Sequence, residues 1–220
     1  MSENRNPIQT VQNALNNLPK AQRDMSFNSD TAIDTPGVRY IARRSDSQSL
    51  EKIKIARYIV EKYIRDLDAV AVDAGSTQQQ IIEKMMGMRY YLSILTNNMT
   101  AFRKNSYQKV SETANEFILT GGKYVDLFDA LHGEETLNSF NSFNPNIVII
   151  GVSGLVAEKG FLCHGNDEVR VKKLLLSKTL SRIIIPVDYN KLGRMDSYSF
   201  GDLEDFRNSG DVNNKVIVVC

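Results

Sequence analysis

The chain has 220 residues, of which 42% are hydrophobic and 24% are charged, a composition typical of a globular protein with one large domain or two small ones. It disfavours global disorder and collagen-like repeats. The formal net charge is only +1, because 27 Lys and Arg residues nearly balance 26 Asp and Glu residues. The chain therefore lacks the broad basic excess expected of a domain that grips a phosphate backbone, and direct DNA binding is not expected.

The first 37 residues differ in composition from the rest of the chain. They are rich in Asn, Ser, Asp, Gln and Pro, and their one periodic feature is an apolar stripe formed by Ile8, Val11, Leu15 and Leu18. We predict a polar N-terminal arm with one short helix over residues 1–37. An α/β domain over residues 38–220 is expected to follow it, and helical spacing of apolar residues begins just after Ser49.

Cysteine usage and the length of the apolar runs favour the cytoplasm. Cys163 and Cys220 lie far apart and belong to no CxxC or Cys/His ligand pattern, so we expect neither a disulfide nor a structural zinc site. The longest apolar runs, such as 183–187, have the length of strands, and residues 1–12 lack the hydrophobic core of a signal peptide. We expect a cytoplasmic protein without a membrane segment.

Short β-branched runs alternate with helical stretches from residue 69 onward. Apolar runs without polar alternation are typical of strands that are covered on both faces. Helical stretches such as 78–86 and 168–180 would provide the crossovers between them. The sequence therefore predicts an α/β fold with a mostly parallel sheet and helices on both faces. The predicted strands are 69–72, 92–95, 117–119, 147–150, 183–187 and 216–219.

A small, polar or Gly-rich turn follows each of the first five predicted strands. Because the carboxyl ends of parallel strands meet at one edge of a sheet, these turns should line a single polar crevice, where open α/β sheets bind ligands. The turns are 73–77, 96–98, 120–122, 151–154 and 188–191.

The first of these turns is a candidate phosphate site. Gly75, Ser76 and Thr77 lie where a strand gives way to a helix, so backbone N–H groups, two hydroxyls and a positive helix end would converge there. The alternative is structural: Ser76 or Thr77 caps the helix and Gly75 relieves a tight turn. The other polar turns at the same edge favour the ligand interpretation.

Charged residues near the same edge could complete an anion site. Asp73 ends an apolar strand, so its carboxylate should accept hydrogen bonds from a loop N–H or a ligand hydroxyl. Lys191 could supply positive charge, and its alternative is a solvated loop. Glu168 and Lys172 are four residues apart, a spacing that by itself favours a surface pair. We expect Lys191→Ala to weaken ligand binding more than the fold.

The histidines and one apolar cluster allow further predictions. Neither histidine has a Ser, Cys or carboxylate at a catalytic or metal-ligand spacing, so we interpret His132 as structural and His164 as a candidate crevice residue. A cluster of apolar residues near the end of one helix favours self-association, with burial in the core as the alternative. The cluster comprises Met85, Met86, Met88, Tyr90 and Tyr91.

The motifs of the chain also occur in a characteristic order. They are Lys52-x-x-Ile55-Ala56, Val70-Ala71-Val72-Asp73-Ala74-Gly75-Ser76-Thr77, Leu95-Thr96-Asn97, Leu119-Thr120-Gly121-Gly122, Ala130-Leu131-x-Gly133, Ile149-Ile150-Gly151-x-x-Gly154, Glu168-x-x-Val171-Lys172-Lys173 and Val187-Asp188-x-x-Lys191-x-Gly193-Arg194. This series resembles the carboxyl-terminal sensor domain of DeoR-family bacterial transcription regulators. The resemblance covers about residues 43–194 and depends on the ordered series rather than on any single motif.

The resemblance implies a fold shared with ribose-phosphate isomerase, glucosamine-phosphate deaminase and CoA transferases, and a phosphorylated sugar or similar metabolite as ligand. It also implies that the turn at 73–77 and Lys172 face this effector, with Asp188 and Lys191 nearby. The expected ligand-binding residues are Asp73, Gly75, Ser76, Thr77, Asn97, Gly121, Gly151, Lys172, Asp188 and Lys191.

Two segments depart from the family pattern. Regulators of this family begin with a winged helix-turn-helix, but the residues before Arg43 are too few and too polar to form one, and Pro7, Pro19 and Pro36 interrupt them. Near the carboxyl end, residues 203–214 look like an abbreviated form of the usual last strand-and-helix segment.

The leading hypothesis is a non-enzymatic module without a cofactor that senses a sugar phosphate and acts through a regulator partner or a second copy of itself. One alternative is an aldose–ketose isomerase with Glu168, Asp188 and Lys172 as catalytic residues. Neighbouring lysines would hold both carboxylates ionised, which disfavours them as bases near neutral pH. The other alternative is a DNA-binding regulator, which the resemblance favours and the missing reader domain opposes.

Overall fold

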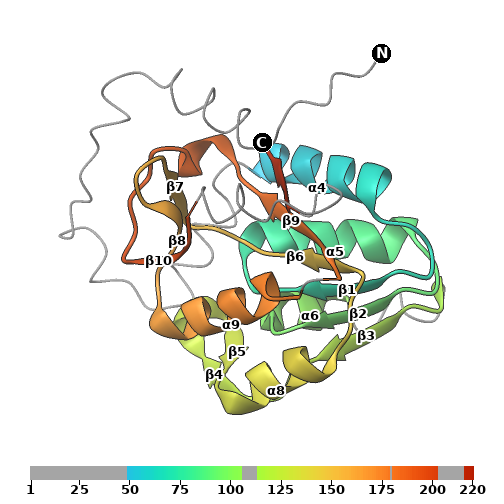
Figure 1. Ribbon diagram of the computed structural model, residues 1–220. Helices are drawn as coiled ribbons and strands as arrows, with labels where there is room; N and C mark the ends of the chain where they lie inside the picture. Colours follow the sequence, from blue (N-terminus) through green and yellow to red (C-terminus); the bar gives the residue numbers. More distant parts are fainter. Residues whose placement is uncertain (1–48, 106–112, 179, 203–215) are drawn as a thin grey trace.

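The computed structural model describes residues 49–105, 113–178, 180–202 and 216–220. The predicted arm at 1–37 and the abbreviated segment at 203–214 lie outside the described residues, so both stay predictions. Figure 1 shows one α/β body built around a central sheet, with helices above and below it.

The central sheet has six strands in the order β11-β9-β6-β1-β2-β3, and every neighbouring pair is parallel. This confirms the predicted α/β fold, and the end of each predicted strand lies within one residue of the observed end. The strands are β1 (Ala69–Val72), β2 (Ser93–Thr96), β3 (Glu116–Leu119), β6 (Ile147–Ile149), β9 (Arg182–Pro186) and β11 (Val216–Val219).

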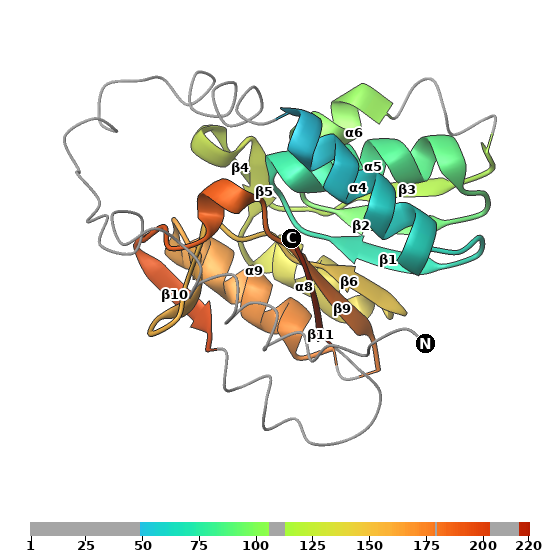
Figure 2. The ribbon, with the colours of Figure 1, turned by 90° about the horizontal axis from the view of Figure 1, so that it is seen from above.

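Helices cover both faces of this sheet, as Figures 1 and 2 show. One face carries α4 (Ser49–Tyr63), α5 (Ser76–Met88) and α6 (Met99–Asn105), and the other carries α8 (Glu134–Ser142) and α9 (Asn166–Leu176).

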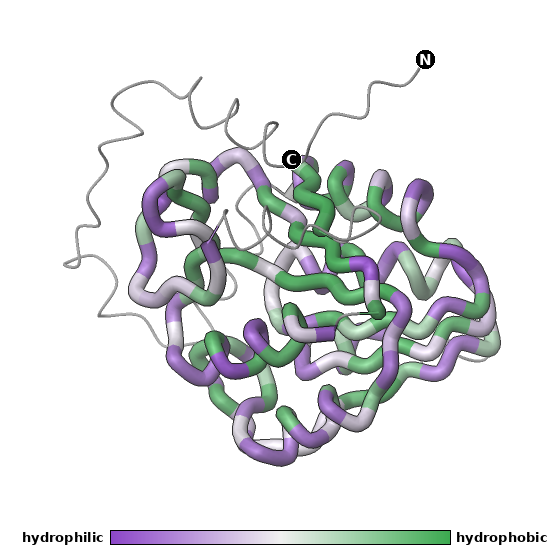
Figure 3. The backbone as a smooth tube through the Cα atoms, in the orientation of Figure 1, coloured by the Kyte–Doolittle hydropathy of each residue, from purple (hydrophilic) through white to green (hydrophobic). Residues whose placement is uncertain are grey.

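Two apolar clusters hold these layers together. Val70 and Val72 of β1 belong to the cluster on the side of α4 and α5, whereas Ala71 belongs to the cluster on the side of α8 and α9. Successive side chains of a strand point to opposite faces, so a strand covered on both faces must be apolar at every position. Figure 3 shows that hydrophobic residues predominate along the central strands, whereas the periphery consists mostly of hydrophilic residues.

Two small β elements beside the central sheet were not predicted from the sequence. The first is a hairpin of β4 (Lys123–Val125) and β5 (Ala130–His132), joined by the 3-10 helix η2 (Asp126–Phe128). The second is an antiparallel sheet of β7 (Gly154–Val156), β8 (Gly160–Cys163) and β10 (Tyr198–Gly201). Most of these strands have only three or four residues, too few to show a polar–apolar alternation. Both elements lie beside the carboxyl edge of the central sheet.

Part of the predicted apolar surface cluster belongs to the core. Met85 and Met86 are fully buried between the helices and the sheet, while Tyr90 and Tyr91 are exposed. The physical reason is helical periodicity: Ile81, Ile82, Met85 and Met86 form one stripe of α5 that faces inward. This part of the prediction was wrong, and self-association stays a prediction without the methionines as its basis.

Other expectations concern disulfides, metals and membranes. Both cysteines are free, and burial raises the pKa of Cys163 to about 12. Across the described ranges, no cluster of His, Cys, Asp and Glu side chains could hold a metal ion. Likewise, no helix in the part of the chain that the structure describes has both the length and the apolar character needed to cross a membrane.

Candidate functional site

A pocket opens at the carboxyl edge of the central sheet, which is where the sequence placed a crevice. This main pocket encloses about 650 Å³, its open mouth included. Its walls come from the loops after β1, β2, β6 and β9, from η2 and from α9. The predicted site residues among its walls are Gly75, Ser76, Gly151, Glu168, Lys172 and Lys191.

The turn after β3 does not reach this pocket. Gly121 is exposed, its carbonyl accepts a hydrogen bond from Thr136 Oγ1 at 2.7 Å, and its N–H donates to Ser139 Oγ at 3.3 Å. Both partners belong to α8. Gly121 therefore fixes α8 against the sheet edge, and of the predicted site residues it is the one that the fold leaves apart from the others.

The N-terminus of α5 forms one end of the main pocket. The helix begins at Ser76, and Gly75 occupies the position before it with no side chain to cap the first-turn N–H groups. Such N–H groups have no acceptor within the helix and carry the positive end of its dipole. Because Gly75 and Ser76 both line the pocket, this end presents donors and partial positive charge to whatever enters it.

Gln78 fills the space between two glycines at this end. A Cβ atom on Gly75 would lie 2.3 Å from Gln78 Oε1, and one on Gly151 would lie 2.2 Å from Gln78 Nε2. A side chain at either position would therefore displace the Gln78 carboxamide, and the positive φ of Gly75 also favours glycine there. The buried Nε2 of Gln78 has no hydrogen-bond partner among the described residues. No sequence pattern indicates this role, because Gln78 occupies an ordinary first-turn position of a crossover helix.

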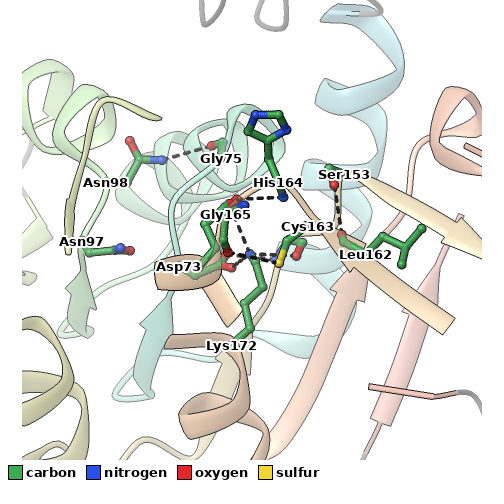
Figure 4. Close-up of polar contacts among 12 residues, drawn as sticks. Asp73, Gly75, Asn97, Asn98, Ser153, Leu162, Cys163, His164, Gly165 and Lys172 are labelled. Carbon is green, nitrogen blue, oxygen red and sulfur yellow. Dashed lines mark hydrogen bonds and ion pairs between the residues drawn. The ribbon is translucent and has the colours of Figure 1, made fainter. Parts of the chain in front are cut away.

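A buried ion pair joins β1 to α9 beneath the pocket. Lys172 Nζ lies 2.5 Å from Asp73 Oδ2 and donates to the Gly151 carbonyl at 3.0 Å, and the Gly151 N–H donates to Asp73 Oδ1 at 2.9 Å. The Lys172 and Asp73 side chains are 4% and 2% exposed. Figure 4 shows Lys172 reaching from α9 to Asp73. Asp73 thus accepts a loop N–H, as predicted.

Burial and charge act in opposite directions on this pair. Burial raises the pKa of Asp73, although Lys172 and the Gly151 N–H oppose the rise. Burial by itself lowers the pKa of Lys172, but attraction to Asp73 and Glu168 raises that pKa overall. Lys172 is therefore a permanent cation in this fold. Removing it would leave Asp73 buried without its counter-ion, so we expect Lys172→Ala to weaken the fold as well as ligand binding.

Glu168 is held by the start of α9 rather than exposed on a helix surface. Its Oε2 accepts the backbone N–H groups of His164 and Gly165, each at 3.0 Å, and its Oε1 lies 3.9 Å from Lys172 Nζ. The Glu168 side chain is 16% exposed and lines the pocket. The surface-pair alternative is therefore wrong for Glu168 and Lys172.

Lys191 stands next to the start of α5. Its Nζ lies 3.2 Å from Asp188 Oδ2 and donates to Thr77 Oγ1 at 3.3 Å. Lys191 is buried and lines the main pocket, so the solvated-loop alternative is wrong. Asp188 and Thr77 are not among the pocket walls; both contact Lys191 and fix the position of its ammonium group.

A second, smaller cavity adjoins the main pocket, and we name it the inner pocket. Its volume is about 180 Å³, which includes the open space at its mouth. It shares Ala74, Glu168 and Lys172 with the main pocket. Its other walls are Asp73, Asn97, His132 and Val171. Asn97 follows β2, and Figure 4 shows it on the neighbouring loop beside Asp73. His132, interpreted as structural from the sequence, is therefore a wall of a polar cavity.

The other histidine has a different environment. His164 Nδ1 lies 3.1 Å from Asp196 Oδ1, and the His164 ring packs edge-on against Phe128 at 6.0 Å between centroids. Its side chain lines neither pocket, whereas Phe128 lines the main pocket. Sequence reasoning missed Phe128 because it lies in η2, inside the hairpin that was not predicted.

Comparison with known proteins identifies relatives of this chain. Residues 47–208 match the family described as the DeoR C terminal sensor domain. The glycerol-3-phosphate regulon repressor of Escherichia coli is 25% identical over 200 residues, covering 89% of this chain and 75% of the repressor. The HTH-type transcriptional regulator GlpR of Haloferax volcanii is 26% identical over 161 residues, covering 72% of this chain and 60% of that regulator.

Solved structures show weaker similarity. Ribose 5-phosphate isomerase A from Methanocaldococcus jannaschii matches with a TM-score of 0.41 and 14% identity, over 66% of this chain and 55% of the isomerase. A probable sor operon regulator from Shigella flexneri matches with a TM-score of 0.40 and 8% identity, over 64% of this chain and 76% of the regulator. The sequence match covers most of the described fold, and on that basis the chain belongs to the DeoR C-terminal sensor domain family.

Proposed function

We propose that the main pocket binds a small phosphorylated sugar or polyol, and that the domain senses this effector for a transcription regulator. The observation that carries the proposal is the end of the pocket formed by α5. There Gly75 and Ser76 present uncapped N–H groups and a hydroxyl, and Lys191 adds an ammonium group. N–H donors, a helix terminus and a cation together are suited to a phosphate group.

The relatives support a phosphorylated effector. The Escherichia coli relative is named for glycerol-3-phosphate as the compound whose regulon it represses, and the matching family is a sensor domain. A phosphorylated three-carbon polyol is therefore a natural first probe. The proposal includes communication with a protein partner, either a regulator or a second copy of the chain.

We further propose that the pocket binds its effector without turnover. An isomerase needs a carboxylate that is ready to take a proton from carbon. Both candidates are engaged elsewhere: Glu168 accepts two backbone N–H groups, and Asp188 faces Lys191. Incubation of an aldose phosphate with the protein in deuterium oxide should give no label at carbon 2. Labelling that Glu168→Gln abolishes would instead support the isomerase alternative.

A thermal-shift panel tests the binding proposal. The panel contains sn-glycerol 3-phosphate, several hexose and pentose phosphates, inorganic phosphate and the unphosphorylated counterpart of each organic compound. A compound present at 100 times its Kd should stabilise the fold by about 2.7 kcal/mol. In a protein of this size, the melting temperature rises by roughly 2 to 4 °C for each kcal/mol of stabilisation. Stabilisation by none of the phosphorylated compounds, or equally by their unphosphorylated counterparts, contradicts the proposal.

Two matched variants, each with a carboxylate at the start of a helix, test whether the phosphate group binds at the start of α5. Ser76→Asp puts a carboxylate at the first residue of the helix, which favours the helix dipole but repels a phosphate, so affinity should fall at least about tenfold without loss of stability. Asn166→Asp puts the same charge at the first residue of α9, at an exposed position outside both pockets, and should leave affinity unchanged. If both variants changed the affinity equally, the phosphate group would not bind at the start of α5.

A further inference from the structure

The inner pocket contains buried polar atoms that the fold does not pair. Asn97 and His132 are 1% and 3% exposed, and both line this cavity. Within the described ranges, Asn97 Oδ1 and the ring nitrogens of His132 make no hydrogen bond of normal geometry, although the backbone of Asp167 lies close enough to raise the pKa of His132. Buried polar groups in folded proteins are almost always paired, because an unpaired one costs about 1–3 kcal/mol. Unpaired atoms from the loop after β2 and from β5, on residues that line one cavity, point to a ligand.

The hydrogen bonds of Asn97 determine which of its atoms faces the cavity. Its Nδ2 donates to the Leu131 carbonyl at 2.9 Å, and the Leu131 N–H donates back to the Asn97 carbonyl at 2.9 Å. A carbonyl cannot pair with an amide oxygen, so this contact fixes the orientation of the carboxamide. The side-chain oxygen of Asn97 is therefore an acceptor in need of a donor.

His132 contributes one donor and one acceptor. Burial lowers the pKa of His132, and the nearby Glu168 and Asp167 only partly oppose this. The ring is consequently neutral near pH 7, with one N–H and one bare nitrogen. Its orientation is set by β5 and by edge-on packing against Phe128, at 5.6 Å between centroids.

The remaining walls determine which chemical group fits. Asp73 and Glu168 bring two carboxylates to the inner pocket, Lys172 brings one ammonium group, and Val171 brings an apolar surface. With Asn97 Oδ1, acceptors predominate, so a second anionic group would be repelled. A hydroxyl both donates and accepts, and carbon-bound hydrogens suit the valine. The inner pocket thus matches a hydroxylated carbon chain, whereas the α5 end of the main pocket matches a phosphate.

We propose that the inner pocket binds the hydroxyl-bearing carbon chain of the effector, with Asn97 and His132 as the residues that select for hydroxyl groups. This inference rests on the proposed function, because it assumes that the phosphate group of the same molecule lies at the start of α5. The two pockets share Ala74, Glu168 and Lys172 as walls, so one short molecule can extend from one to the other.

Titration calorimetry with three probes tests the inference. The probes are sn-glycerol 3-phosphate, n-propyl phosphate, which has the same carbon chain without hydroxyls, and inorganic phosphate. The wild type should bind glycerol phosphate at least about tenfold more tightly than propyl phosphate, since unpaired hydrogen-bonding groups in a site discriminate against a ligand that lacks their partners. His132→Leu should remove most of this preference and leave the affinity for inorganic phosphate unchanged.

Thr120→Val is the matched control. Thr120 is also buried, and its Oγ1 has no partner among the described residues, but it lines neither pocket. The variant removes an equivalent unpaired group and should keep the full preference for glycerol phosphate. Folding of each variant is checked by its thermal transition before titration.

The possible outcomes separate the two proposals. A wild type that binds no phosphorylated compound of the thermal-shift panel contradicts the proposed function, and the inference fails with it. A wild type that binds phosphorylated compounds but does not prefer glycerol phosphate to propyl phosphate overturns the inference alone. A preference that survives in His132→Leu also overturns it, because residues other than His132 would then select for the hydroxyl groups.

Discussion

The two sides of the inner pocket treat buried polar groups in opposite ways. On the side of α9, Asp73 and Lys172 are each paired, with each other and with the backbone of Gly151. On the side of β5, Asn97 Oδ1 and the His132 ring are equally buried and make no hydrogen bond of normal geometry among the described residues. Paired groups stabilise the fold, while unpaired groups reduce its stability. Changes on the two sides should therefore affect stability with opposite signs.

The largest expected effect is on the paired side. Lys172→Met keeps much of the side-chain volume but leaves the Asp73 carboxylate buried without its ammonium partner, which should cost about 3–5 kcal/mol in the free energy of unfolding. Urea denaturation measures this loss. Adding Asp73→Asn to Lys172→Met removes the uncompensated charge and should recover part of it. A single variant as stable as the wild type would show that the pair does not support the fold.

A fully paired asparagine should behave like the ion pair on a smaller scale. Asn115 is buried, its Oδ1 accepts the Leu92 N–H at 2.8 Å, and its Nδ2 donates to the Arg89 carbonyl at 3.0 Å. Asn115→Ala leaves both backbone groups without these partners and should cost about 1–3 kcal/mol.

The control for this variant is Asn138→Ala, at an exposed position on α8. Surface substitutions of this kind usually change stability by no more than about 0.5 kcal/mol. Equal losses in the two asparagine variants, measured by urea denaturation, would contradict the difference between paired and exposed amide groups.

On the side of β5, a substitution that removes the unpaired groups should leave the free energy of unfolding unchanged or raise it. His132→Leu replaces two unpartnered nitrogens by apolar atoms of similar extent, so the free energy of unfolding at pH 7 should stay equal or rise by up to about 1 kcal/mol. His164→Leu provides the comparison, because His164 is paired with the buried Asp196 carboxylate and its loss should destabilise the fold. Thermal denaturation of both variants in the absence of ligand decides the matter. A clear loss in His132→Leu would mean that the ring supports the fold after all.

The smallest expected effect concerns pH. Because burial lowers the pKa of His132, the unfolded chain binds a proton there more readily than the folded one as the pH falls through about 6.5, the ordinary histidine value. This contribution makes the wild type less stable at lower pH. His132→Leu lacks it, so its stability relative to the wild type should increase from pH 8 to pH 5 in urea denaturation. Parallel pH profiles for the two proteins would contradict this.

The sequence predicted the central sheet and much of the main pocket because both follow from local patterns. Uniformly apolar runs such as 183–187 identify strands that are covered on both faces, and the turn at 73–77 identifies the strand-to-helix junction at the pocket. The family resemblance correctly moved Lys172 from a surface pair to the pocket wall. These features depend on residues that are neighbours in the chain.

The inner pocket could not be predicted in the same way. His132 reaches Asn97 because β5 pairs with the loop after β2, through the hydrogen bonds between Leu131 and Asn97. The strands of this hairpin have three residues each, so their sequence carries no periodic signal. Gln78 was missed for a related reason: its role depends on Gly75 and Gly151, which lie in different loops. Long-range contacts of this kind leave little trace in a single sequence.

The central position of β1 also has a consequence for folding kinetics. Contacts among β1, α5 and β2 are close in sequence, but β1 pairs with β6 across a long loop, and Asp73 meets Lys172 99 residues later in the chain. Contacts that close long loops are slow to form, so we expect the two pockets to be completed late in folding. An effector would then stabilise a state that forms after the rate-limiting step. It should prolong the lifetime of the native domain by slowing unfolding, while leaving the refolding rate nearly unchanged.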